Sequence, residues 1–341
     1  MKKNAKNTFL AMSAMALILA GCSSDDNDGT PDLPPIGGYD NSDEVAAANL
    51  VAKWSFENDL KDSKNNIAGV GTLAGYSVGK KGQAFQGSST EARYAIYNGE
   101  TAVGAVSSFS LAFWMKAGQT VPDGGTPGQG KGAQGIFSLV NPDGFWGGLN
   151  LFLENPDDNN PTKLRIKMDI ENKRTGVVWQ GQGPIFNVAS IDTWVHIVLT
   201  YDAATSRFSA YQNGELGAVN SLSGVPYGLF GTTASNILYG NDPGGPGPVG
   251  DYPTDPAATP GSNGNPNSAP LYGALEFATP ALSQVVIGSH QFTTTPSLTT
   301  VHGTEPWSTT YAGALDEFRI YKSALTLAEV NALFLLESAN R

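Results

Sequence analysis

The feature that most constrains this chain is a strict alternation of apolar and polar residues in short segments, most clearly in residues 163–170. Leu164, Ile166, Met168 and Ile170 alternate there with Lys163, Arg165, Lys167 and Asp169. Because successive side chains of a strand point to opposite faces, the pattern predicts a half-buried antiparallel strand with one polar face. We expect that polar face to be either open to solvent or the floor of a groove.

Other segments share this period and are separated by turn-forming residues. Residues 109–116 alternate in the same way, so Trp114 is expected to pack in a second layer rather than to bind a ligand. Residues 136–140 and 149–153 predict one hairpin. Residues 194–216 predict another, in which Asn213-Gly214 is a type I′ turn signal. Together these segments predict an all-β sandwich.

Composition supports one large all-β domain with long loops. The chain has 341 residues, including 41 glycines and 21 prolines, and a sandwich of this size can bury a core without staples. A single cysteine, Cys22, excludes an intrachain disulfide. The formal net charge of -11 argues against nucleic acid or anionic lipid as the main partner, and it suits neutral glycans, cations or solubility alone.

The N-terminal residues have the features of a targeting segment. Residues 1–21 combine a basic start, an apolar run too short to span a bilayer, and Leu19-Ala20-Gly21 before Cys22. This resembles a bacterial lipoprotein signal peptide, which implies a lipidated Cys22 as the first mature residue. The alternative is an ordinary cleaved signal with a chance cysteine.

The next segment, residues 22–44, reads as an acidic tether rich in proline and glycine. Its acidic run, residues 23–28, resembles the export signal of lipoproteins displayed on the Gram-negative surface, although acidic runs are also common in solvated linkers. We therefore expect an outer-membrane lipoprotein whose lipid anchor lies in the membrane and whose domain faces the cell exterior.

The C-terminal part, residues 312–334, combines a strand with a helix. Residues 316–321 alternate as a strand does. Thr326 and Glu329 then form a capping-box signal, and the apolar stripe that follows consists of Leu327, Val330, Leu333 and Phe334. We expect a strand that leads into a short terminal helix.

Four stretches in order point to a family: residues 50–63, 108–116, 194–216 and 316–330, the last reading Asp-Glu-Phe-Arg-Ile-Tyr-Lys-Ser-Ala-Leu-Thr-Leu-Ala-Glu-Val. They resemble the laminin-G-like, concanavalin A-type jelly roll of bacterial secreted proteins. The resemblance implies a two-sheet antiparallel jelly-roll sandwich with a short C-terminal helix, here residues 45–341. This fold hosts lectins, hydrolases and spacers, so the fold alone does not name a function.

The same resemblance implies a structural calcium ion that joins the opening segment to the closing strand. Its ligands would be Glu57, Asp59 and Asp316, with backbone carbonyls, since calcium prefers oxygen ligands. The alternative is that these carboxylates only shape turns and pair locally. A second candidate cation site is Asp242, Asp251 and Asp255, within a long loop over residues 236–274.

No catalytic residues are assigned. Glucanases of this fold carry two carboxylates on one face of a strand, whereas Asp316 and Glu317 are adjacent and are expected to point to opposite faces. His196, His290 and His302 have no triad context, and His196 is expected to be a satisfied core residue.

Aromatic residues in predicted loops and strand ends are the candidates for ligand binding. Glycan recognition needs exposed aromatic faces beside polar groups, and Trp146, Trp179, Tyr252 and Trp307 satisfy the first condition. The first hypothesis is a non-catalytic lipoprotein that binds polysaccharide or surface glycoprotein glycans. The alternatives are an adhesion or assembly module that contacts a protein through residues 236–274, and a hydrolase of the same fold.

Overall fold

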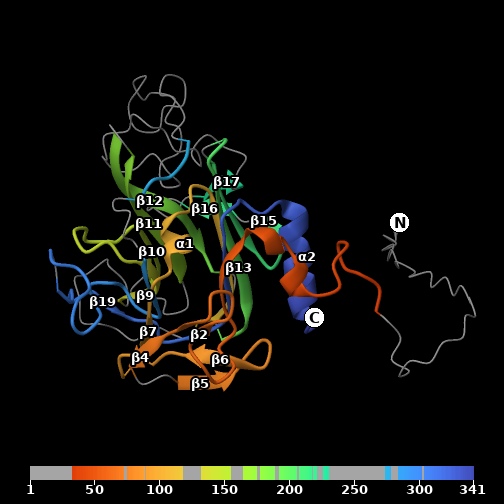
Figure 1. Cartoon of the computed structure of the whole chain (residues 1–341), viewed down its shortest axis with the longest axis horizontal. Coiled ribbons are helices and arrows are strands. Elements are labelled where there is room, and N and C mark those ends of the chain that lie inside the picture. Colours follow the sequence, from red (N-terminus) through yellow and green to blue (C-terminus); the bar gives the residue numbers. More distant parts are fainter. Residues whose placement is uncertain are drawn as a thin grey trace, which may run out of the picture. The chain divides into compact units, whose positions relative to one another are not determined.

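Strands make up most of the regular structure in the computed structural model (Figure 1). It describes residues 33–72, 75–88, 90–117, 132–154, 164–174, 177–188, 192–205, 207–216, 218–220, 226–229, 273–277, 283–301 and 303–341. For residues 72, 171–174, 177–187, 207, 218–220 and 226–229 only the backbone is described. All statements below concern these residues.

The larger sheet runs in the order β15, β14, β13, β8, β20, β1, β2, β3, and β6 pairs with both β20 and β5. Its strands are β1 (Leu50–Trp54), β2 (Lys61–Asp62), β3 (Ile67–Ala68), β5 (Gly75–Val78), β6 (Gln83–Gln86), β8 (Phe109–Lys116), β13 (Val195–Asp202), β14 (Arg207–Gln212), β15 (Glu215–Leu216) and β20 (Ala314–Tyr321). The turn between β14 and β15 has φ of 51° at Asn213 and 82° at Gly214. Positive φ at both positions confirms the expected type I′ turn.

The smaller sheet runs in the order β12, β11, β10, β9, β18, β7, β4. Its strands are β4 (Val70–Thr72), β7 (Tyr94–Asn98), β9 (Ala133–Leu139), β10 (Leu149–Glu154), β11 (Arg165–Arg174), β12 (Val177–Asn187), β18 (Gln284–Ile287) and β19 (Ser308–Thr310), the last parallel to β9. A separate hairpin joins β16 (Ala218–Asn220) to β17 (Pro226–Leu229). Every other pairing described is antiparallel.

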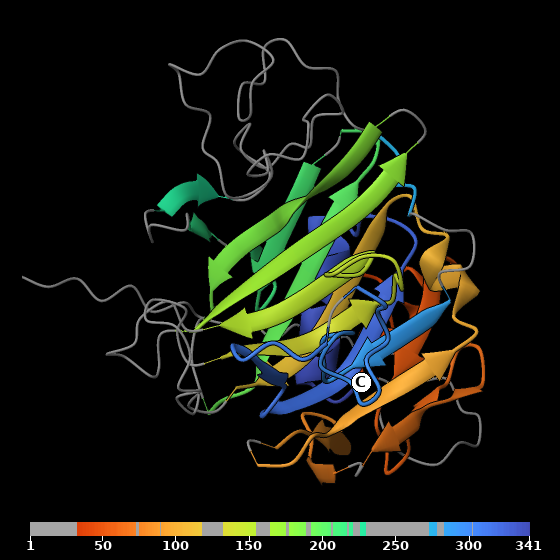
Figure 2. The ribbon, with the colours of Figure 1, turned by 90° about the vertical axis from the view of Figure 1, so that its left-hand side faces the viewer.

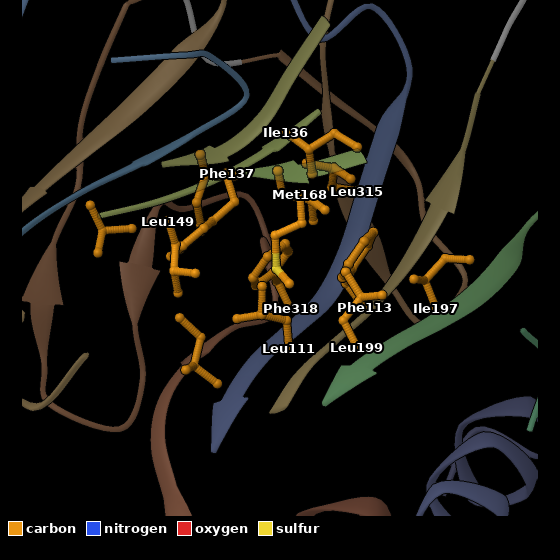
Figure 3. Close-up of a cluster of buried hydrophobic side chains, with 14 of the residues drawn as sticks. Leu111, Phe113, Ile136, Phe137, Leu149, Met168, Ile197, Leu199, Leu315 and Phe318 are labelled. Carbon is orange, nitrogen blue, oxygen red and sulfur yellow. The ribbon is translucent and has the colours of Figure 1, made fainter. Parts of the chain in front are cut away.

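The core lies between the two sheets, as the alternation predicts. Figure 3 shows side chains of both sheets directed toward each other: Leu111, Phe113, Ile197, Leu199, Leu315 and Phe318 from the larger sheet, and Ile136, Phe137, Leu149 and Met168 from the smaller. The ring of Phe318 stacks on Phe113 at 4.9 Å and on Phe137, across the interface, at 5.7 Å. Burying each such side chain stabilises the fold by about 1.5–3 kcal/mol.

The beginning and end of the domain form neighbouring strands. Trp54 of β1 pairs directly with Phe318 of β20, and their ring centroids are 6.0 Å apart. With the two stacked sheets, this pairing confirms the predicted jelly-roll sandwich.

The helices are short except for the last. They are η1 (Ser42–Glu44), η2 (Ala47–Asn49), α1 (Thr101–Gly104) and α2 (Leu327–Ser338). The hydroxyl of Thr326 accepts a hydrogen bond from Glu329 N at 3.3 Å, and the Glu329 carboxylate accepts one from Thr326 N at 2.8 Å, which confirms the capping box. Helix α2 therefore lies at the C-terminal position that the sequence predicts.

Helix α2 covers the outer face of the larger sheet, on the right of Figure 1. Val330, Leu333 and Leu336 are buried there against Val198 and Tyr211. Leu327 differs from the expected stripe because its side chain is 53% exposed. The buried stripe begins one turn later, at Val330.

Beneath α2 lies a buried ionic network around Arg319, which is fully buried. Its guanidinium pairs with Glu317 at 2.6 Å and Asp43 at 3.0 Å, and it also contacts Glu337. Lys53 joins the network through Asp43 and through Glu317 at 3.4 Å. The cations lower the pKa of Asp43 to about 2 and that of Glu317 below its usual value, although burial opposes both shifts.

Two aromatic side chains complete this buried layer. Trp114 is 3% exposed, and its Nε1 donates to Glu337 at 2.6 Å. His196 is fully buried 5.0 Å from the Trp114 ring, and burial lowers its pKa to about 3. Trp114 is therefore packed, as expected, but under α2 rather than against a second sheet. His196 is a core residue, yet neither ring nitrogen has a hydrogen-bond partner among the described residues.

The compact unit begins earlier than the sequence suggests. Residues Pro35–Arg341 form one unit, so residues 35–44, expected to belong to a tether, are part of the domain. Ile36 and Tyr39 pack against the α2 cluster, and Ser42 N donates to the carbonyl of Arg341 at 3.2 Å. Asp43 and Ser42 hold Arg319, which explains why this polar segment packs. In the described part, no helix is long and apolar enough to cross a bilayer.

Candidate functional site

The outer face of the smaller sheet carries the site that the sequence points to. Figure 2 shows this face toward the viewer, with the loop of the β9–β10 hairpin and the loop after β18 lying over the strands and α2 behind. Three loop segments contribute aromatic side chains here: residues 141–148, 289–301 and 303–307. We define the aromatic cluster as Phe145, Trp146, Phe152, His290, Phe292 and Trp307, whose rings contact one another.

The two tryptophans meet at the outer edge of this cluster. Their ring centroids are 5.5 Å apart and their planes are tilted by 41°. Trp146 also stacks on Phe152 of β10 at 5.6 Å, with planes 10° apart. Trp146 and Trp307 are partly exposed, whereas Phe152 is buried. The cluster thus has a buried base and an accessible edge made of two indole rings.

A second stack supports the same edge. Phe145 stacks on Phe292 at 4.5 Å with planes 11° apart, and Phe292 stacks on His290 at 4.7 Å. Trp307 lies 5.6 Å from the Phe292 ring. Ring pairs in such geometry are worth about 0.5–1.5 kcal/mol each beyond the area they bury. The tryptophans therefore rest on a packed base.

Gln291 fixes the loop that presents Trp146. It is fully buried; its amide nitrogen donates to the carbonyls of Asn141 at 3.1 Å and Gly144 at 2.7 Å, and its oxygen accepts from Asn141 N at 2.8 Å. At Gly147, φ is 89°, and a Cβ there would lie 2.6 Å from the Leu139 carbonyl, so only glycine fits the turn. Two loops distant in sequence are thereby held together.

His290 ties the cluster to the sheet. Nδ1 lies 3.1 Å from Asn150 Oδ1 of β10, and Nε2 lies 3.0 Å from the Ala133 carbonyl of β9. Burial lowers the pKa of His290 to about 4, so the ring is neutral at pH 7. These contacts and its complete burial give it a positioning role rather than that of a free base.

Charged residues of β10 and β11 border the cluster. Glu154 pairs with Arg165 and lies 3.7 Å from Lys167, whose ammonium is 5.6 Å from the Phe152 ring. Arg165, Lys167 and Asp169 are only 8%, 7% and 3% exposed. The polar face of β11 is therefore largely covered and is not an open solvent face.

The structure brings together two of the four predicted ligand residues, Trp146 and Trp307. Trp179 lies in β12, but its side chain falls outside the described residues, as does all of Tyr252. The same holds for Asp242, Asp251 and Asp255, for His302, and for residues 236–272 of the long loop. These predictions stay predictions.

Sequence reasoning missed the base of the cluster. Phe152 carries a signal, because it occupies a polar-face position between Asn150 and Glu154 while its neighbours Leu151 and Leu153 face the core. An aromatic residue on the polar face of a strand predicts a second layer above it. Phe145 and Phe292 carry no comparable signal, since loop residues have no periodicity.

Two of the predicted calcium ligands lie near the same turn, but the three do not form a coordinating group. Asp316 accepts a hydrogen bond from Lys81 N at 2.9 Å, and Glu57 accepts one from Gln83 N at 3.1 Å. Asp59 accepts from Lys61 N at 3.0 Å. No three His, Cys, Asp or Glu side chains within the described ranges are arranged to hold a metal ion. As they stand, the three carboxylates do not fit a cation site, and calcium binding stays a prediction.

A β-bulge changes the expected geometry of Asp316 and Glu317. Pairing of β20 with β8 shifts between Asp316 and Arg319, and Glu317 has φ of 47°. Asp316 lies opposite Trp114, and Glu317 reaches Arg319, so both carboxylates lie on the side that faces α2. The expectation of opposite faces is wrong, because the bulge interrupts the alternation. Burial, followed by the nearby Glu317, raises the pKa of Asp316 to about 7.

Comparison with known proteins agrees with this architecture. Residues 89–253 match the family model Laminin_G_3, the concanavalin A-like lectin/glucanases superfamily. Comparison with the curated proteins gives no match.

Several solved structures are similar over most of the chain. One is domain 4 of AbnA, a GH43 extracellular arabinanase from Geobacillus stearothermophilus, in complex with arabinotriose: 18% identity, 84% of this chain, 98% of that chain, TM-score 0.41. Another is the binding domain of Paraclostridial Mosquitocidal Protein 1, with 16% identity, 84% and 52% coverage and a TM-score of 0.47. A third is the binding domain of botulinum neurotoxin DC in complex with SialylT, with 10% identity, 87% and 52% coverage and a TM-score of 0.46.

The chain spans about half the length of the last two structures. All three likenesses are too distant to bear on function. The match over residues 89–253 and the two stacked sheets show a laminin-G-like, concanavalin A-type jelly-roll fold in this chain.

Proposed function

We propose that this domain binds polysaccharide or glycoprotein glycans through the exposed edge of the aromatic cluster. The observation that carries the proposal is the contact between Trp146 and Trp307, which two separate loops bring to 5.5 Å while both rings stay partly exposed. Sugar rings present apolar C–H faces that pack on indole rings, and their hydroxyls bond to nearby polar groups.

The rigidity of the cluster favours binding rather than mere packing. Its base is stacked and its loops are joined by the buried Gln291 side chain, so the indoles lose little conformational freedom when a ligand arrives. A loop tryptophan that only filled a gap would not need such support. The preformed edge thus lowers the entropic cost of association.

Replacing Trp146 or Trp307 by Ala tests the proposal. In affinity electrophoresis through gels containing polysaccharide, and on a glycan array, we expect each change to weaken binding about 10-fold or more, since it removes a stacking partner worth about 1 kcal/mol and its buried area. Trp194→Ala is the matched control. Trp194 is also partly exposed, but it lies next to Lys116 at the start of β13 in the other sheet.

The fold of each variant is checked by its thermal midpoint and near-ultraviolet circular dichroism. Retention unchanged in both cluster variants, with the fold intact, would refute the glycan site. Equal loss in Trp194→Ala would show that the effect is not local to the cluster.

We further propose that the domain is a lipoprotein of the outer membrane, facing the exterior. The support is the basic and apolar segment that ends at Cys22 and the acidic run after it, all outside the described residues. Cys22→Ser should abolish incorporation of labelled palmitate and release the protein from membranes. Persistent labelling would contradict lipidation at Cys22. Complete protection from external protease in intact cells would contradict the outward orientation alone.

A further inference from the structure

A polar pocket of about 310 Å³ is lined in part by residues of the two loop segments that also carry Phe292 and Trp307 of the aromatic cluster. One wall is the segment between β6 and β7, with Ser88 and Thr90. The opposite walls are the loop after β18, with Thr293 and Thr295, and the strand β19 with the residues before it. The function proposed above does not use this pocket.

The described lining of this pocket is almost entirely hydroxyl-bearing. All of it is serine or threonine except Glu91 and Ala92. Glu91 supplies its only charge, and that carboxylate is held by Arg93, at 3.2 Å from Nε and 2.7 Å from Nη2. Hydroxyls both donate and accept hydrogen bonds, so the pocket matches a ligand whose own groups do the same.

Several of these hydroxyls are already oriented. Thr293 Oγ1 and Ser308 Oγ are 3.0 Å apart, and Ser308 Oγ donates to the Glu305 carbonyl at 2.9 Å. Ser88 Oγ accepts hydrogen bonds from the backbone N–H groups of Thr90 and Glu91, each at 3.2 Å. Such bonds fix the positions of the hydroxyls before a ligand binds.

The pocket and the aromatic cluster are joined through the chain itself. Thr293 follows Phe292, and Ser308 follows Trp307, so the same two segments that bring those rings to 5.6 Å also bring the two hydroxyls together. Consecutive Cα atoms are about 3.8 Å apart. The aromatic edge and the pocket therefore adjoin each other.

We infer that the glycan is an uncharged chain held at two adjoining subsites, one sugar ring against Trp146 and Trp307 and a neighbouring one in the hydroxyl pocket. This inference rests on the proposed glycan binding. Among the described residues around this pocket, a uronate or sialate carboxylate would find no cation other than Arg93, which Glu91 already holds, and the chain has a net charge of -11. Neutral chains are favoured because the described lining offers mainly hydroxyls, and its one carboxylate, Glu91, is already paired with Arg93.

The test compares neutral and acidic polysaccharides as probes for the full domain. We expect wild-type protein to be retained by at least one of arabinan, galactan, mannan and β-glucan, and not by polygalacturonate or alginate. Retention should not change between 50 and 500 mM salt, because no ion pair forms. The double variant Thr295→Val/Thr304→Val removes two exposed hydroxyls of the pocket while keeping side-chain shape.

We expect this double variant to bind the retained polysaccharide about 10-fold more weakly, since each lost hydrogen bond is worth about 0.5–1.5 kcal/mol. Thr101→Val, which changes an exposed threonine at the start of α1, is the control and should bind like wild type. The hydrogen bond from Thr295 N to the Tyr94 hydroxyl involves the backbone and survives the substitution.

The outcomes separate the two claims. If wild-type protein binds no polysaccharide on either panel or the glycan array, the proposed function fails. If it binds only acidic polymers, or if the double variant binds neutral polymer as well as wild type while Trp307→Ala does not, glycan binding stands and the neutral two-subsite inference is overturned.

Discussion

The two outer faces of this sandwich are covered in different ways. On the larger sheet, α2 covers a layer in which Arg319 forms ion pairs with Glu317 and Glu337, and all three side chains are at most 2% exposed. On the smaller sheet, loops cover the strands and leave the edges of Trp146 and Trp307 accessible. The first cover encloses ion pairs, whereas the second leaves aromatic rings partly exposed. The second face therefore carries the proposed glycan site.

The largest expected effect tests the closed face. Arg319→Met leaves Glu317 and Glu337 buried without their guanidinium, and breaking a buried pair costs about 3–5 kcal/mol. Urea denaturation should show that loss in the free energy of unfolding. Arg93→Met, at a partly exposed pair with Glu91, is the control and should cost less than about 1 kcal/mol. Equal losses in both would show that the buried network has no special weight.

A smaller effect is the pH dependence of stability that the buried histidine of each face contributes. The folded-state pKa is lowered to about 3 for His196 and about 4 for His290, mainly by burial. The unfolded histidines take up protons below pH 6.5 while the folded ones stay neutral, so the stability that these two residues contribute is complete above that pH and falls as pH drops toward 4. Each histidine should contribute about 2 kcal/mol to that loss between pH 6.5 and 4.5.

Phenylalanine substitutions distinguish the two histidines. His196 has no hydrogen-bond partner in the described structure, so His196→Phe should change stability little at pH 7 and reduce the loss in acid. His290→Phe forfeits its contacts to Asn150 and Ala133, and should cost about 2 kcal/mol at pH 7 and weaken glycan binding. Thermal or urea unfolding from pH 8 to 4.5 measures both. If the two variants lost equal stability at pH 7, the contacts of His290 would not distinguish it from His196.

The smallest expected effect concerns the predicted calcium ligands. If Glu57, Asp59 and Asp316 bind calcium with a dissociation constant near 0.1 mM, 1 mM calcium should add about 1.4 kcal/mol of stability relative to a chelator. Differential scanning calorimetry with calcium and with EGTA measures it, and Asp59→Asn should abolish the shift. An unchanged midpoint would exclude a stabilising calcium site there.

Period-two patterns carried the fold prediction because they report which face of a strand is buried. They place Leu164, Ile166, Met168 and Ile170 in the core, and local capping chemistry places α2 at Thr326. Alternation fails where the backbone departs from regular geometry. The bulge at Asp316–Arg319 moved Asp316 and Glu317 to one side, and nothing in the local sequence announces it.

The candidate site was predictable only in part for a related reason. The exposure of Trp146 and Trp307 follows from their positions in loops. The contact between the two rings depends on hydrogen bonds between distant segments, chiefly those of Gln291. A glutamine in a loop gives no sign of which backbone it will bind. The same applies to residues 35–44, whose polar composition suggests a linker while Asp43 and Ser42 bind the buried Arg319.

Arg319 connects the two ends of the domain, and this makes the fold sensitive to proteolytic nicking. A cut between Asp43 and Lys53 would free the segment that carries one of its carboxylate partners, and removal of the last turn of α2 would take away Glu337. Either event would leave a buried guanidinium or carboxylate without one of its ion-pair partners. Trimming at one terminus would thus loosen the other, and intact ends protect each other from degradation.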